Sequence, residues 1–205
     1  GMNITTAIRN VLVGGLAGDS LTEGAYNTAV GMFALSTEDA HGMNTAVGYG
    51  ALEQQNAGAN AYNTAIGYNA GNAITTAINN TFVGGNTGLA LQSGNDNTAV
   101  GTYAADALTV GVRNVAIGTY ALSSEDGNGY NVAVGHGALL NQNAGADAHN
   151  TAVGYSTGAA ITTGIYNTLM GAYAGDALTT GNKNVAIGYG ALSTEDAHTG
   201  NVAIG

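Results

Sequence analysis

Cysteine, proline and tryptophan are absent from this chain of 205 residues, and charged side chains make up only 8% of it. Without cysteine there is no disulfide framework, so the sequence does not indicate a redox compartment. The lack of proline and of glycine at every third position excludes collagen. Only Arg9, Arg113 and Lys183 are fixed cations, and the formal net charge is −10. This balance argues against binding to nucleic-acid phosphates or anionic membranes.

Long apolar runs are also missing, because no stretch of 18 apolar residues occurs and the first residues lack a signal-peptide pattern. We therefore expect no membrane-inserting segment here. Small residues are abundant instead, with 34 glycines and 37 alanines. Side chains this small cannot fill a wide core at native packing density. An apolar content of 45% argues against disorder, so the composition favours a thin, elongated body.

A five-residue motif, Asn-[Thr/Val]-x-[Val/Ile/Met]-Gly, recurs along the entire chain. Its usual period is a 17-residue interval, and two 19-residue intervals interrupt this spacing. Self-similarity at a fixed period indicates a repeat protein, and we assign residues 1–205 to a single repeat array. The twelve motif asparagines are Asn10, Asn27, Asn44, Asn63, Asn80, Asn97, Asn114, Asn131, Asn150, Asn167, Asn184 and Asn201.

Each complete coil of the repeat carries one large aliphatic side chain, which we call its plug. Counting the motif asparagine as position zero, the plug stands at position eight or at position eleven. The plugs at position eight are Leu35, Leu52, Leu122, Leu139 and Leu192. Those at position eleven are Leu21, Ile74, Leu91, Leu108, Ile161 and Leu178, and position eight is then Gly or Ala.

The period predicts an all-β fold, a parallel β-solenoid or β-roll with 17- or 19-residue coils. Such coils are too short for helical-hairpin repeats, and Gly and Asn at fixed positions disfavour helices but suit corners of positive φ. Positions one and three of the motif share one strand face, and position two, usually Ala, points the other way. We expect the first face to line the core and the Ala face to meet partner chains in a threefold bundle. The alternative is a single-chain solenoid whose Ala face meets water.

The acidic segment beginning at Ser36 returns at Ser123 and Ser193, which indicates a superrepeat of four coils with one extra coil. The chain starts inside a coil and ends on a bare motif. Because neither end carries a polar capping repeat, we expect a segment of a longer fibre or a subunit that continues end to end.

The segments Asn63-Thr64-Ala65-Ile66-Gly67-Tyr68 and Asn184-Val185-Ala186-Ile187-Gly188-Tyr189 resemble repeats of phage tail fibres and of trimeric autotransporter adhesin heads. The resemblance covers essentially the whole chain. It implies a left-handed parallel β-roll, a homotrimer and a place outside the cell, on a virion tail fibre or a cell surface. The coil here is longer than the usual adhesin head repeat, and within residues 1–205 we expect no receptor-binding tip, coiled-coil stalk or membrane anchor.

Three sets of side chains are candidates for a site. The asparagines form a predicted structural ladder, in which stacked amides satisfy corner backbone groups. Tyr49, Tyr68, Tyr155 and Tyr189 share position five, where rings either bind a host glycan or simply pack along the corner. Glu38, Asp39 and His41, repeated as Glu195, Asp196 and His198, offer metal ligands. The middle copy lacks the histidine and no calcium-loop pattern occurs, so solvated turns are the favoured interpretation and no metal or cofactor is assigned.

Catalysis finds no support, because neither a Cys nucleophile nor a Gly-x-Ser-x-Gly motif is present. The sequence therefore favours a structural or adhesive fibre shaft that displays a distal site for a host glycan or protein receptor. A self-assembling extracellular filament is one alternative. A glycan-binding or ice-binding solenoid is another, although Thr and Val exchange at position one, which indicates burial of that column. The threonines of the column are Thr28, Thr45, Thr64, Thr81, Thr98, Thr151 and Thr168.

Overall fold

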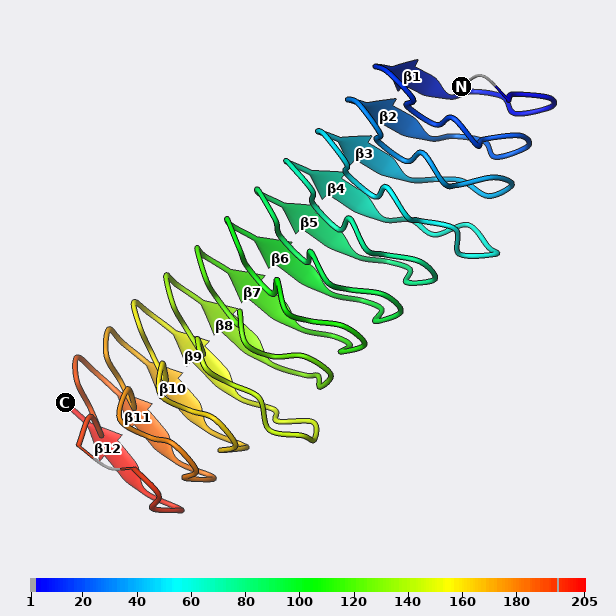
Figure 1. The fold of residues 1–205 in the computed structure, drawn as a ribbon. Helices are drawn as coiled ribbons and strands as arrows, with labels where there is room; N and C mark the ends of the chain where they lie inside the picture. Colours follow the sequence, from blue (N-terminus) through cyan, green and yellow to red (C-terminus); the bar gives the residue numbers. More distant parts are fainter. Residues whose placement is uncertain (1–2, 195) are drawn as a thin grey trace.

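The computed structural model describes residues 3–194 and 196–205, which form a parallel β-solenoid (Figure 1). Twelve three-residue strands within these ranges form one parallel sheet in sequential order. The predicted fold class is thus confirmed, and each strand begins directly after a motif asparagine. The strands are β1 (Val11–Val13), β2 (Thr28–Val30), β3 (Thr45–Val47), β4 (Thr64–Ile66), β5 (Thr81–Val83), β6 (Thr98–Val100), β7 (Val115–Ile117), β8 (Val132–Val134), β9 (Thr151–Val153), β10 (Thr168–Met170), β11 (Val185–Ile187) and β12 (Val202–Ile204).

Strand register is the same in coils of both lengths. Thr28 pairs with Thr45 across a 17-residue coil, and Thr45 pairs with Thr64 across a 19-residue coil. The two extra residues are therefore accommodated outside the sheet. Backbone hydrogen bonds also join successive coils away from the strands, as from Leu35 N to Ala51 O at 3.0 Å. No helix among the described residues has the length and apolarity needed to cross a bilayer.

The alanines at position two point into the solenoid, and the prediction that positions one and three line the core is wrong. Ala46 is fully buried, whereas Thr45 and Val47 on either side of it are only half-buried. The interior is too narrow for two rows of β-branched side chains, because the alanine already faces the plug from the opposite wall. Phe82 illustrates this limit, since a Cβ on Gly88 would lie 2.6 Å from its ring.

The predicted plugs fill this thin core. Of the eleven large aliphatic side chains that are fully buried, ten are plugs, and the other is Leu169 at position two of β10. Leu192, the remaining plug, is only partly buried and packs against the same cluster. Stability consequently depends on stacking, since one coil alone buries too few apolar groups to offset its ordering entropy.

The glycine that ends each motif is required by contact between coils. Gly84 has φ of +139°, and a Cβ there would lie 2.6 Å from the carbonyl oxygen of Gly101 in the next coil. The adjacent Gly85 has no atom within 4 Å of its would-be Cβ. Only the first of these two glycines is therefore demanded by the fold.

The motif asparagines do not occupy the positive-φ corners that the sequence predicted for them. The residue before each motif does, as in Tyr26 at φ 62°, Met43 at 66° and Arg113 at 55°. A left-handed conformation costs a residue with a side chain about 1–2 kcal/mol. The stacked contacts described below offset this cost, and the asparagine contributes its side chain instead.

Candidate functional site

The motif asparagines form a continuous ladder of side-chain to backbone hydrogen bonds. The Oδ1 atom of each ladder asparagine accepts the backbone N–H of the next one, at 2.8–3.1 Å along all eleven steps. From Asn27 to Asn184 the ladder asparagines are at most 1% exposed. The ladder thus satisfies a buried backbone donor at the start of every strand, which is a structural role.

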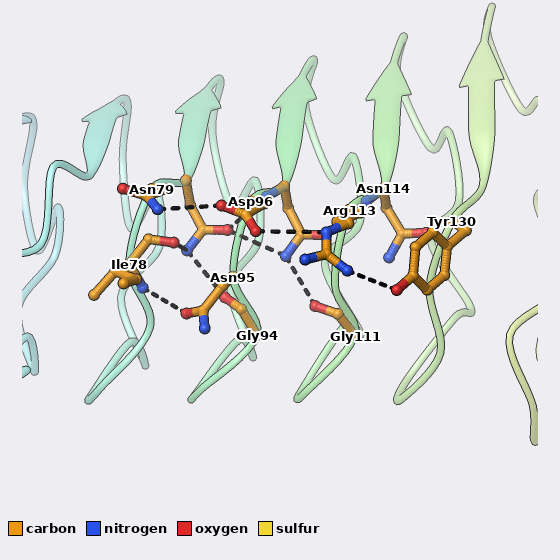
Figure 2. Close-up of polar contacts among 11 residues, drawn as sticks. Ile78, Asn79, Gly94, Asn95, Asp96, Gly111, Arg113, Asn114 and Tyr130 are labelled. Atoms are coloured by element: carbon orange, nitrogen blue, oxygen red, sulfur yellow. Dashed lines mark hydrogen bonds and ion pairs between the residues drawn. The ribbon is translucent and has the colours of Figure 1, made fainter.

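The amide nitrogen of the ladder asparagines completes the corner in most coils. Asn97 Nδ2 donates to Gly111 O, fourteen residues further on, at 2.8 Å, and to Asn80 Oδ1 at 3.1 Å (Figure 2). Asn44 and Asn131 lack such a partner. These two asparagines open the 19-residue coils, where the insertion displaces the carbonyl at position fourteen. Asn201 also lacks one, and position fourteen lies beyond the end of its chain.

A second buried polar position was missed by the sequence analysis. Where the plug stands at position eight, position eleven holds Glu or Gln. The four of these residues that the structure describes, Glu38, Gln55, Glu125 and Gln142, are fully buried. Gln55 accepts a bond from the Nδ2 atom of the following ladder asparagine at 2.7 Å and donates to Thr75 O at 3.4 Å. The signal was at position eleven, which holds Glu or Gln in every coil whose plug stands at position eight and Leu or Ile in the other complete coils.

The two glutamates at position eleven are less well satisfied than the glutamines. Glu38 Oε1 accepts the backbone N–H of His41 at 3.1 Å, and Glu125 Oε1 accepts that of Asn128 at 3.0 Å. The Oε2 atom of each glutamate is buried without a hydrogen-bond partner. Burial raises the pKa of both carboxyls above the ordinary value of 4.5, and the hydrogen bonds oppose this rise.

The structure brings the first set of metal candidates together. One donor atom from each of Glu38, Asp39 and His41 lies within 4.8 Å of the others. Among the described residues no other cluster of three potential ligands meets this distance. In the third copy, Asp196 and His198 are described, but Glu195 lies outside the described residues.

The candidate glycan-binding tyrosines lie in rows in which neighbouring rings pack on each other. Tyr49 stacks on Tyr68 with centroids 5.4 Å apart and meets the edge of Phe33 on its other side. Tyr155 likewise stacks on His136 and makes an edge contact with Tyr173. Tyr49 and Tyr155 therefore pack along the corner, although they remain 44% and 49% exposed. Tyr68 and Tyr189 are more exposed, at 57% and 78%.

A mixed polar and aromatic row runs along the residues that precede the motif asparagines. Asn79 Nδ2 donates to Asp96 Oδ1 at 3.1 Å, and Arg113 lies 3.7 Å from Asp96 and donates to the Tyr130 hydroxyl at 2.6 Å (Figure 2). Beyond Tyr130, the rings of His149 and Tyr166 continue the stack.

The outer face of the sheet is an apolar surface that we call the strand stripe, made of positions one and three of β1 to β12. Its position-three side chains include Ile66, Ile117 and Met170, exposed by 41%, 38% and 50%. Threonine and valine at position one are half-buried in most strands. The described residues contain no pocket.

No protein-family model, curated protein or solved structure matches the chain. The proposed function therefore rests on the surfaces described above.

Proposed function

We propose that the chain is a structural and adhesive shaft segment of an extracellular fibre, such as a phage tail fibre or a surface adhesin, which holds a distal receptor-binding site. The observation that carries the proposal is the unbroken axial bonding, in which strands, corners and the asparagine ladder link every coil to the next. Eleven steps of one strand spacing give a length of about 50 Å. A rod bonded along its whole length transmits position and force between its ends.

The shaft associates in threes through the strand stripe. Three residues across and eleven steps along give the stripe an area of about 500 Å². Monomers rarely expose larger apolar patches, yet a stable interface buries about 800 Å² on each partner. The tyrosine rows that flank the strands supply the remainder of the contact. This replaces the expected contact through alanine, because the alanines are inside.

Solution mass tests the association. The intact chain is expected at about three times its 20.1 kDa mass in analytical ultracentrifugation. Val47→Asp places a charge on the stripe and is expected to give monomers, while Thr76→Asp adds the same charge at an exposed position outside the strands. A stable monomer of the unmodified chain at micromolar concentration would refute the trimer.

A second candidate function is binding to ice, and the direction of the threonine column favours it. Thr28 to Thr98 give five successive outward threonines on a regular parallel sheet. Threonine and valine exchange along this column, which is half-buried in the single chain. Valines at Val115 and Val132 interrupt it. Thermal hysteresis of a concentrated solution is the deciding measurement, and its absence removes this candidate.

A further inference from the structure

The turn between β2 and β3 holds buried polar atoms whose bonding is incomplete. Glu38 is fully buried, and its Oε2 atom has no hydrogen-bond partner. His41 Nδ1 is also buried and unpartnered, and it lies 3.9 Å from Glu38 Oε1, which is too long for a hydrogen bond. Leaving such a group unsatisfied costs about 1–3 kcal/mol. Two orphan atoms on side chains of the same turn therefore point to a ligand that satisfies both.

The backbone of this turn is fixed before any ligand binds. The Asp39 carbonyl accepts the N–H of Thr22 at 2.7 Å and that of Glu23 at 3.1 Å. The His41 carbonyl accepts Nδ2 of the ladder residue Asn27 at 3.2 Å. Rotation of the three side chains is then the only movement needed to bring their donor atoms around a common point.

The donor distances are close to those of a coordinated ion. Two ligands at about 2.1 Å from a tetrahedral zinc ion lie about 3.4 Å apart. The observed atoms lie within 4.8 Å of one another, so they must close by about 1.5 Å at most to meet that geometry. Asp39 is exposed, and its Oδ1 atom accepts the Ala40 N–H at 2.6 Å, which leaves its second oxygen for a ligand.

We propose that Glu38, Asp39 and His41 form a binding site for a divalent transition-metal ion, with Zn²⁺ as the fitting ion. One imidazole nitrogen and two carboxylate oxygens match zinc, and water fills the fourth position as in open three-ligand zinc sites. The ion satisfies the buried glutamate and offsets two negative charges in a chain of net charge −10. It clamps one turn of the shaft and needs no neighbouring coil.

The middle copy of the superrepeat is a natural control. It carries Asn128 where the first copy carries His41. Asn128 Nδ2 donates to Glu125 Oε1 at 3.0 Å, so an amide stands there in place of the imidazole, while Glu125 Oε2 stays unpartnered as in the first copy. The third copy repeats the ligand sequence of the first with Asp196 and His198, so its histidine is removed in the test below.

The experiment titrates the intact chain carrying His198→Asn with ZnCl₂ by calorimetry and with CoCl₂ by visible absorption. We expect saturable binding of one metal ion per chain and visible d–d absorption bands from the bound cobalt. Adding His41→Asn, which copies the residue at 128, should weaken binding at least tenfold, because loss of even an outer contact costs about 10- to 100-fold. Circular dichroism checks that this double variant keeps its fold.

A gain of binding completes the test. Asn128→His added to the His41→Asn, His198→Asn chain is expected to restore one bound ion. Asp39→Asn, at an exposed position, tests the site if the histidine variant unfolds. Absence of saturable binding by the His198→Asn chain overturns the proposal. So does binding that survives both His41→Asn and Asp39→Asn, since surface imidazoles such as His136 and His149 would then hold the metal.

Discussion

Two asparagines with the same motif are expected to differ in their contribution to stability. Asn97 Oδ1 accepts the Asn114 N–H at 2.9 Å, and its Nδ2 donates to Gly111 O at 2.8 Å. Asn131 Oδ1 accepts the Asn150 N–H at 3.1 Å, but its Nδ2 has no partner. Both residues are buried in complete coils. Asn97→Ala and Asn131→Ala therefore remove the same atoms but different bonds.

The expected magnitudes follow from the backbone groups left unpaired. A buried donor or acceptor without a partner costs about 1–3 kcal/mol. Asn97→Ala leaves two such groups and should lower the free energy of unfolding by about 2–6 kcal/mol, whereas Asn131→Ala leaves one and should cost about 1–3 kcal/mol. For a chain of this size, each kcal/mol by which the two variants differ in stability should separate their Tm values by about 2–4 °C.

Thermal and urea unfolding of the two variants measure the difference, and amide hydrogen exchange localises it. Faster exchange is expected at the Asn114 amide in Asn97→Ala and at the Asn150 amide in Asn131→Ala. Equal destabilisation by the two substitutions, or a larger effect of Asn131→Ala, would refute the argument that the amide nitrogen bonds only in the 17-residue coils.

Four further substitutions test other parts of the fold. Gly84→Ala should destabilise by more than about 2 kcal/mol, from strain and the close carbonyl, while Gly85→Ala should stay within about 0.5 kcal/mol, both measured by urea unfolding. Ala116→Leu should lower Tm through overpacking by about 1–3 kcal/mol, and an unchanged Tm would contradict the inward direction of position two. Burial raises the folded pKa of Glu125, so the native protein loses stability as pH rises from 4.5 through that pKa. Glu125→Gln should therefore stabilise by about 1 kcal/mol at neutral pH and lose this advantage below pH 4.5, and a pH-independent effect would contradict it.

The coil length, strand positions and plugs were predictable because each leaves a periodic signal in the sequence. The plug alternates between two positions, and both send a side chain into the same space, as Leu35 and Leu21 do. Which face of each strand points into the core was not predictable. A three-residue strand with Val, Ala and Ile has apolar side chains on both faces, so alternation alone does not identify the inside.

The candidate sites depended on contacts between coils. The sequence placed Glu38, Asp39 and His41 near each other, but it gave no sign that Glu38 is buried with an unsatisfied oxygen. Likewise, position five predicted a row of tyrosines, but not that Tyr49 stacks on Tyr68 and makes an edge contact with Phe33. Such outcomes follow from side-chain rotation and from the neighbouring coil, and neither has a periodic signature.

The sequence by itself determined that this protein is a parallel β-solenoid with 17- or 19-residue coils, because hydrogen-bonded stacking forces equivalent residues to recur at a fixed period. Only the tertiary structure decided that alanine faces inward and that the valine and isoleucine stripe faces outward. The distance between the two walls of the coil made that choice, since a plug and an alanine already fill the interior. The surface available for a partner chain is fixed by the same distance.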